Sequence, residues 1–221
     1  MKLKTLATAV CLAATTFALP AMAAVQTINL AGFNDTKTNF TETFNLQQFD
    51  YHLGTLTAIN ISYSAEVTGQ LLLSNSKSVA KNVNMQLNSA MQLSLPGEVL
   101  GSDARNLLSG SVVSAAKSTD VLVGKHSETL IVNVNVADSD FAKFIGAGAL
   151  ESQLQITATS GANSPTGITA DYSTLVHSLG GKITYTYIPA SVPEPETYGM
   201  MLLGLGVLAY AGKRKARAAQ V

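Results

Sequence analysis

The segment that decides the fold class is Val83-Asn84-Met85-Gln86-Leu87-Asn88-Ser89-Ala90-Met91-Gln92-Leu93-Ser94-Leu95. Apolar residues stand at nearly every odd-numbered position of this segment, and polar residues stand at nearly every even-numbered one. A period of two residues is typical of a β-strand that buries one face and leaves the other in water. The length of the segment predicts either one long bent strand or two strands joined by a bulge near Ser89 and Ala90.

Shorter runs with the same alternation surround this segment on both sides. They are residues 25–30, 40–46, 59–67, 71–73, 121–123, 130–136, 154–156 and 183–187. Turn-forming residues separate the runs, at Gly32-Phe33-Asn34-Asp35, Pro96-Gly97, Gly161-Ala162-Asn163-Ser164-Pro165 and Gly180-Gly181. Many short strands without a long helical period predict an all-β fold, a single antiparallel β-sandwich of jelly-roll type over residues 24–190.

One helical turn is expected within this β domain, at Asp138–Ile145. Asp138 or Ser139 would cap the turn, because both residue types accept hydrogen bonds from the first free amides of a helix. The apolar side chains of the turn would face inward, namely Phe141, Phe144 and Ile145.

Residues 1–23 have the composition of a secretory signal peptide. Met1-Lys2-Leu3-Lys4 is a short basic region, a mostly apolar stretch follows, and Ala21 and Ala23 are the small residues that a signal peptidase reads. We expect cleavage after Ala23. The one cysteine, Cys11, lies in the removed segment, so the mature chain is expected to depend on its hydrophobic core, without disulfides or thiolate chemistry.

Charge is distributed unevenly along a chain whose formal net charge is zero. Between Ala24 and Val192, twelve acidic and eight basic side chains leave a net charge near −4, while other basic residues gather at the two ends. A mildly acidic body without a basic stripe in its sequence gives no electrostatic reason to expect binding to nucleic acid.

The C-terminal region begins with Val192-Pro193-Glu194-Pro195, continues in an apolar run, and ends in the basic residues Lys213, Arg214, Lys215 and Arg217. The two prolines predict an extended segment that a protease can reach. Residues 198–212 predict a helix of about 22 Å, which is short against a hydrocarbon core of about 30 Å. We therefore expect a short transmembrane helix whose basic end stays in the cytoplasm.

A Pro-Glu-Pro triplet, a short hydrophobic segment and a basic end, in this order over residues 191–221, resemble the PEP-CTERM sorting signal of exported proteins of Gram-negative bacteria. The resemblance implies cleavage near the triplet by the membrane protease exosortase. It also implies a route from an inner-membrane intermediate to the outer envelope surface or the extracellular matrix. The alternative is a plain C-terminal membrane anchor on a proline-containing stalk.

Three segments of the body resemble the choice-of-anchor E domain of bacterial exported proteins. They are Phe49-Asp50-Tyr51-His52-Leu53-Gly54-Thr55-Leu56, Phe144-Ile145-Gly146-Ala147-Gly148-Ala149-Leu150 and Gly181-Lys182-Ile183-Thr184-Tyr185-Thr186-Tyr187. The resemblance implies an extracellular β domain joined to a surface-attachment signal, and it brings no activity with it.

The same segments also have structural explanations. Phe49 and Leu53 would be core contacts, and Asp50 would bind nearby backbone amides. Three glycines would supply backbone angles that other residues resist, namely Gly54, Gly146 and Gly148.

The search for catalytic and metal-binding groups gives one candidate site. His52, His126 and His177 have no spacing that suits zinc, and no G-x-S-x-G element marks a hydrolase. Asp138 and Asp140 offer carboxylates at i and i+2 that suit calcium, although the same residues also make a good helix cap. We expect no catalytic residue and no cofactor.

Two functions of different classes remain open. The favoured one is a non-enzymatic surface or matrix protein. During export it is cleaved by signal peptidase and exosortase and is held transiently in the membrane, and it then associates with exopolysaccharide. Polar sheet faces rich in Asn, Gln, Ser and Thr favour it. The alternative is a secreted carbohydrate-active or other hydrolase on a β-sandwich. If residues 83–95 formed a sheet edge, their length would also favour pairing with a second copy.

Overall fold

The computed structural model describes residues 22–190 and 195–218. The chain divides into two compact units, one of which is the body Ala23–Ile188. The other contains the helix α2 (Pro195–Ala218).

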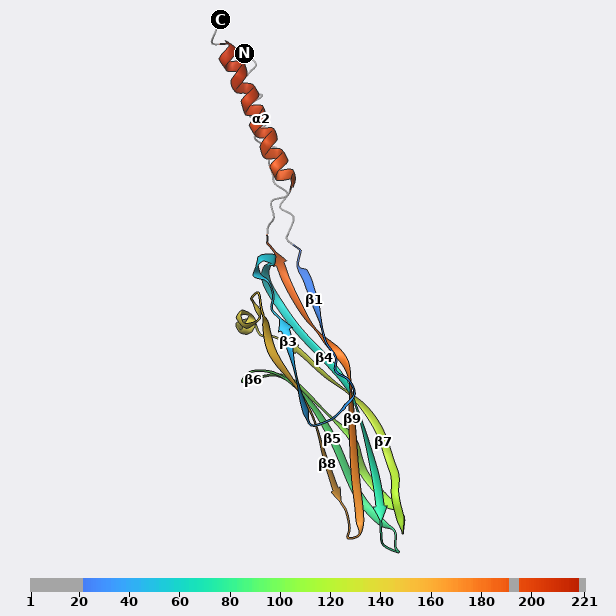
Figure 1. Ribbon diagram of the computed structural model, residues 1–221. Helices are drawn as coiled ribbons and strands as arrows, with labels where there is room; N and C mark the ends of the chain where they lie inside the picture. Colours follow the sequence, from blue (N-terminus) through green and yellow to red (C-terminus); the bar gives the residue numbers. More distant parts are fainter. Residues whose placement is uncertain (1–21, 191–194, 219–221) are drawn as a thin grey trace. The chain divides into compact units, whose positions relative to one another are not determined.

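The body consists of two β-sheets, here called sheet A and sheet B. Figure 1 shows their long strands side by side along the length of the body. Sheet A has the order β1 (Ala24–Leu30), β9 (Ile168–Pro189), β4 (Gly54–Asn75) and β7 (Ser118–Asn135), with the short β2 (Thr36–Lys37) paired to β9. Sheet B has the order β3 (Phe40–Gln47), β8 (Ala149–Asn163), β5 (Lys81–Leu95) and β6 (Glu98–Ser114). Two short 3₁₀ helices, η1 (Tyr51–Leu53) and η2 (Asp138–Phe144), complete the body.

The strands pair as nested layers around the turn at Pro96-Gly97. The innermost pair is β5–β6, and β4–β7, β3–β8 and β1–β9 follow outward along the chain, all antiparallel. Gly97 has a φ of 81°, which glycine adopts without steric cost. Eight strands nested in this way over two sheets have the order of a jelly roll. The expected all-β, antiparallel sandwich is confirmed.

The core lies between the sheets and is built by the predicted alternation. Ile61, Tyr63 and Val67 of β4 and Leu87 and Met91 of β5 are almost fully buried. Burial of a large apolar side chain contributes about 1.5–3 kcal/mol, so these inward rows provide much of the stability.

The central segment is one strand, and its place in the sheet corrects one expectation. β5 is a single strand, with register shifts against β6 at Leu87/Asn88 and Leu93/Ser94 in place of a bulge at Ser89 and Ala90. It lies between β8 and β6 and is therefore not an edge. The condition for self-association through residues 83–95 is therefore not met, because both sides of the strand are already paired.

Several strands are longer than expected. Residues 59–67 and 71–73 belong to one strand, β4, and residues 121–123 and 130–135 both belong to β7, which ends one residue before the predicted run does. Gly180-Gly181 was expected to be a turn but lies inside β9, where Gly180 has a φ of 84° and the strand continues. Hydrogen bonding to long neighbouring strands overrides the local turn preference of a glycine pair.

The β6 strand was not predicted at all. It is an edge strand, and along most of its length its side chains are partly or fully exposed, with Leu107 and Ser114 as its buried residues. A strand that buries so little carries no clear apolar alternation for a sequence reading to detect.

The structural explanations of the choice-of-anchor E segments are partly confirmed. Phe49 is buried, and Asp50 accepts a hydrogen bond from the backbone N of His52 at 2.9 Å. Gly54 has a φ of 148°. Leu53, however, is exposed, because it lies in η1 at the surface.

The explanation of Gly146 and Gly148 was also wrong, since neither residue shows a left-handed backbone. A side chain at position 146 would contact the side-chain amide of Gln48, so the lack of space explains why glycine stands at this position.

Candidate functional site

The C-terminal sorting region lies in the unit outside the body. Pro195 is the first residue of α2, a position at which proline is favoured because its missing N–H has no helical partner. Lys213, Arg214, Lys215 and Arg217 belong to the same helix, which is longer than the expected 198–212. Val192, Pro193 and Glu194 lie outside the described residues, as does Ala21 of the expected signal peptidase site.

The expected transmembrane helix needs correction. Across the described parts of the chain, including α2, no helix combines the length and the apolar character needed to cross a membrane. In α2, the uncharged run between Glu196 and Lys213 is shorter than the roughly 20 apolar residues that a span requires and includes four glycines.

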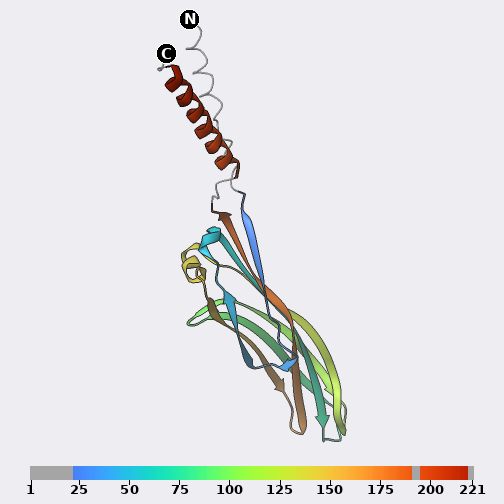
Figure 2. The same cartoon turned by 45° about the horizontal axis from the view of Figure 1, so that its top comes forward.

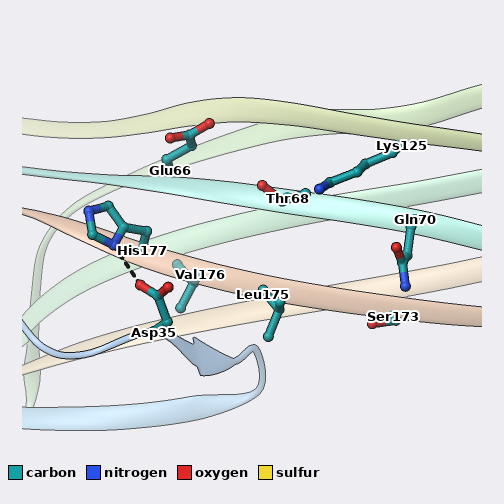
Figure 3. Close-up of a pocket in the computed structure, with 9 residues that line it drawn as sticks. All are labelled: Asp35, Glu66, Thr68, Gln70, Lys125, Ser173, Leu175, Val176 and His177. Carbon is teal, nitrogen blue, oxygen red and sulfur yellow. Dashed lines mark hydrogen bonds and ion pairs between the residues drawn. The ribbon is translucent and has the colours of Figure 1, made fainter.

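A shallow groove of about 180 Å³ lies on the outer face of sheet A and is shown in Figure 3. Its walls come from β4, β7, β9 and the loop before β2, through Asp35, Glu66, Thr68, Gln70, Lys125, Ser173, Leu175, Val176 and His177. We call this feature the sheet A groove. It is smaller than the roughly 300–1,000 Å³ of usual small-molecule sites.

Strand pairing explains why Asp35 and His177 meet although they are far apart in sequence. Thr36 of β2 is paired with Val176 of β9, which sets the preceding residue Asp35 beside His177. The Asp35 Oδ1 and His177 Nδ1 atoms are 2.6 Å apart, as the dashed line in Figure 3 marks. A carboxylate at Nδ1 orients an imidazole ring, as in the acid–base half of a hydrolase triad.

The surroundings of this pair do not complete a triad. The side chains of His177 and Asp35 are 59% and 72% exposed, so water screens their interaction. Among the described residues, no hydroxyl is hydrogen-bonded to the opposite ring nitrogen, Nε2 of His177. Glu66 and Lys125 add one charge of each sign, which leaves the groove without a strong potential.

The other two histidines also stand beside carboxylates at the surface. Nδ1 of His52 lies 2.7 Å from Asp50, and Nε2 of His126 lies 3.3 Å from Glu128. The hydrogen bond from the backbone N of His52, followed by the one from its ring, lowers the pKa of Asp50.

The calcium candidate at Asp138 and Asp140 is not assembled into a metal site. Asp140 forms an ion pair with Lys143 at 2.9 Å, and Lys143 also contacts Glu98 at 2.6 Å. These hydrogen bonds raise the pKa of Lys143, so its ammonium group occupies the place that a cation would take. In the described part of the chain, no three metal-ligating side chains gather at one point.

The capping role expected of Asp138 or Ser139 was wrong as well. The N-cap of η2 is Ala137, whose side chain makes no capping hydrogen bond. Phe144 is buried as expected, Phe141 packs partly buried against the core, and Ile145 is exposed.

The outer face of sheet B is largely polar, and the exposed Val99 and Val113 of the edge strand β6 interrupt it. Outward side chains of neighbouring strands line up in rows across the sheet, such as Thr41–Gln155–Gln92–Ser102 and Thr43–Gln153–Ser94. At one end of this face, a shallow depression of about 510 Å³ is lined by Asn84, Met85, Gln86, Gly161, Ala162 and Asn163. Amide and hydroxyl groups in rows can donate and accept hydrogen bonds toward hydroxyl-rich polymers.

The sequence analysis foresaw the polar rows but missed the sheet A groove. Alternation in β5 predicts an outward polar face directly. No local signal links Asp35 to His177, because their contact depends on the pairing of the two-residue β2 with β9.

Comparison with known proteins identifies the tail. The family described as the PEP-CTERM protein-sorting motif matches residues 191–215. The predicted sorting motif is thereby confirmed, and it indicates an exported protein that passes through the membrane and is processed by exosortase. No curated protein sequence matches the chain.

Solved structures resemble the body only distantly. They include the STIV MCP, at 12% identity and a TM-score of 0.28 over 80% of this chain and 52% of the other. The tobacco streak virus coat protein has 7% identity and a TM-score of 0.25, over 82% and 96%. The carbohydrate-binding module CBM36 has 12% identity and a TM-score of 0.19, over 72% and 98%. The chain spans about half the length of the STIV MCP. Scores this low carry no argument about function.

Proposed function

We propose that the chain is a non-enzymatic exported protein of a Gram-negative bacterium, cut from its signal peptide after Ala23 and from its sorting motif near Pro193–Pro195. Its β-sandwich body, which resembles the choice-of-anchor E domain, is delivered to the outer envelope surface or the extracellular matrix. There the body associates with exopolysaccharide.

The observation that carries the exopolysaccharide part is the polar surface of sheet B. Its rows Thr41–Gln155–Gln92–Ser102 and Thr43–Gln153–Ser94 present amides and hydroxyls from all four strands on one face. When such groups bind a sugar, their hydrogen bonds to water are replaced by hydrogen bonds to sugar hydroxyls, and the net change in free energy is small. This balance suits reversible association with a hydrated polymer.

Mass spectrometry of the protein's two ends tests the processing steps. In membrane, surface and culture-medium fractions, we expect a first residue of Ala24 and loss of residues 198–221. A triple substitution, Pro193→Ala, Glu194→Ala and Pro195→Ala, should retain the intact C-terminus in the inner membrane. Glu151→Ala, an exposed residue of β8, serves as the control and should be processed normally. An intact tail on the wild-type protein, confined to the inner membrane, would show an ordinary anchor.

A secreted hydrolase is the second candidate, and the Asp35–His177 pair is the observation that favours it. Assays of polysaccharide turnover with the wild-type chain and with His177→Ala separate the two functions. We expect no turnover by either protein. Turnover by the wild type that disappears in the variant would establish the hydrolase and refute the non-enzymatic proposal.

A further inference from the structure

Three lysines come together at one end of the β-sandwich, where the loops β4–β5, β6–β7 and β8–β9 meet. They are Lys77, Lys81 and Lys117, all exposed, and we call them the basic tip. We propose that the basic tip binds a carboxylated polysaccharide, that is, a polymer containing uronic acids. This inference rests on the proposed association with exopolysaccharide and assigns the polymer's charge and the surface that binds it.

Hydrogen bonds between the loops hold two of the lysines side by side. The backbone N of Lys117 donates to the carbonyl oxygen of Lys77 at 2.8 Å, and Nζ of Lys117 donates to the carbonyl oxygen of Ser76 at 3.1 Å. Lys81 opens β5 in register with Ser114, at the end of β6. Lysines up to 40 positions apart in sequence thereby share one surface.

The buried Asn75 fixes the first of these loops. Its Nδ2 donates to the carbonyl oxygens of Val79 at 3.1 Å and Ser114 at 3.2 Å, and its Oδ1 accepts from the backbone N of Lys77 at 2.9 Å. The third loop is attached through Gly167, whose carbonyl oxygen accepts from the backbone N and from Oγ of Ser76, each at 3.0 Å. The tip is therefore a preformed surface, which lowers the entropy cost of binding.

The lysines of the basic tip form no ion pair with a carboxylate of the described body, and the hydrogen bond from Nζ of Lys117 goes to a neutral carbonyl oxygen. Among the lysines of the body, Lys143 is the one that forms ion pairs with carboxylates. The carboxylate nearest in sequence, Asp120, is engaged with Oγ of Ser74 at 2.9 Å. Lys117 also has a φ of 53°, which lysine adopts less readily than glycine or asparagine, so the turn presents a charge where an uncharged residue would fit better.

The shallow depression on sheet B adjoins the tip. Asn84 and Asn163, which are paired across β5 and β8, line the depression of about 510 Å³ three residues from Lys81. Lysine ammonium groups next to amide side chains match a chain of sugars that carries both carboxylates and hydroxyls.

The tip lies at the end of the body opposite the C-terminal end of β9. β9 begins beside the tip at Ile168 and runs for 22 residues to Pro189, about 70 Å at the rise of a β-strand. In Figures 1 and 2, the ends of β4, β7, β8 and β9 gather at this end of the body. A protein attached near residue 190 would present the basic tip away from its attachment point.

Nucleic acid fits this surface less well than a uronic acid polymer. Proteins that bind single strands stack bases on aromatic rings and use arginine, whereas the tip loops contain Lys, Ser, Ala, Val, Thr, Pro and Gly at residues 76–81, 115–117 and 164–167. The sorting motif also takes the protein out of the cell, away from most nucleic acid.

Affinity electrophoresis of the full chain in a non-ionic detergent tests the proposal, with polygalacturonate as the acidic polymer and dextran as the neutral one. Lys77→Gln with Lys117→Gln should weaken binding to polygalacturonate about fivefold or more, since each exposed ion pair contributes a factor of roughly two to five. Adding Lys81→Gln should weaken it further. The control, Lys37→Gln with Lys182→Gln, removes the same charge elsewhere and should bind like the wild type. Binding should also weaken as salt is raised.

Each other outcome overturns the proposal in its own way. Equal losses in the tip variant and the control would mean that net charge, and not the tip, governs binding. Binding to dextran as tight as to polygalacturonate, with both left unchanged in the tip variant, would refute the tip but leave the polysaccharide association standing. No binding to either polymer would refute both. Tighter binding to duplex DNA than to polygalacturonate at the same salt would refute the carbohydrate assignment.

Discussion

β9 approaches β4 closely at Gly181, and Gly181→Ala is expected to destabilise the body. A methyl group at this position would meet the ring of Tyr63 at Cδ2 and would lie 2.6 Å from the carbonyl oxygen of Ser62. Tyr63 cannot move aside, because its ring stacks on Phe44 at 5.8 Å and its hydroxyl is hydrogen-bonded to Ser178 at 2.8 Å. The clash must therefore be relieved by separating two paired strands.

The magnitude follows from two opposing effects. Overpacking of this kind costs about 1–3 kcal/mol, while replacing glycine by alanine stabilises by about 0.4–1 kcal/mol through the unfolded chain. We expect a net loss of about 1–2 kcal/mol in the free energy of unfolding, which lowers Tm by about 3–8 °C in a domain of this size.

Thermal unfolding followed by circular dichroism measures this effect, and Gly161→Ala is the matched control. Gly161 lies in β8, and a methyl group there would have no atom within 4 Å. The control should keep or slightly raise Tm, because it gains the entropic benefit without a clash. Equal Tm values for Gly181→Ala and the wild type, or an equal loss in both variants, would refute the packing argument.

Two further predictions concern the aromatic side chains around Phe49. Phe49→Ala should lower the free energy of unfolding by about 3–5 kcal/mol, because Phe49 is buried and its ring centroid lies 5.6 Å from that of Tyr185 and 5.0 Å from that of Tyr187. Leu53→Ala should change this free energy little, because Leu53 is exposed. Equal losses for the two variants in urea denaturation would contradict the assignment. Burial raises the pKa of Tyr185, whose hydroxyl donates a hydrogen bond to the carbonyl oxygen of Gln47 at 2.6 Å. Up to about pH 10 this tyrosine is neutral in both the folded and the unfolded chain, and its contribution to stability is complete. At higher pH the unfolded chain releases the proton first, so the stability of the fold falls. Tyr185→Phe should lose part of that alkaline sensitivity in Tm measured from pH 8 to 11, and an unchanged slope would show that the sensitivity has another source.

The sequence predicted a strand well where one of its faces is almost completely buried, and poorly where few of its residues are buried. β5 packs one face on the core between two neighbours, so its alternation is nearly unbroken and the strand was predicted. β6 is its partner in the same hairpin but lies at the edge and buries little, so the same rule detects nothing there. Periodicity reports burial, and an edge strand held by backbone hydrogen bonds is invisible to it.

Glycine shows the same limit on a local scale. Gly97 and the Gly180-Gly181 pair look alike as turn signals, yet Gly97 makes a turn and Gly181 provides space against Tyr63 in the middle of β9. The difference depends on which strand lies opposite, and that partner is more than a hundred residues away in sequence.

The polar surface of sheet B and the basic tip depend on the nested strand pairing to different degrees, and this difference explains why the sequence predicted the first and missed the second. The polar rows of sheet B follow from alternation within each strand, so their existence was foreseen without the topology. The basic tip follows from the pairing alone: nesting around Pro96-Gly97 brings the loops after β4, β6 and β8 to one end and sets the first residue of β1 beside Tyr187 at the other. A body that is acidic on average thus carries a local positive surface. The same topology places the C-terminal end of β9, which the sorting motif follows in the sequence, at the end of the body opposite that surface.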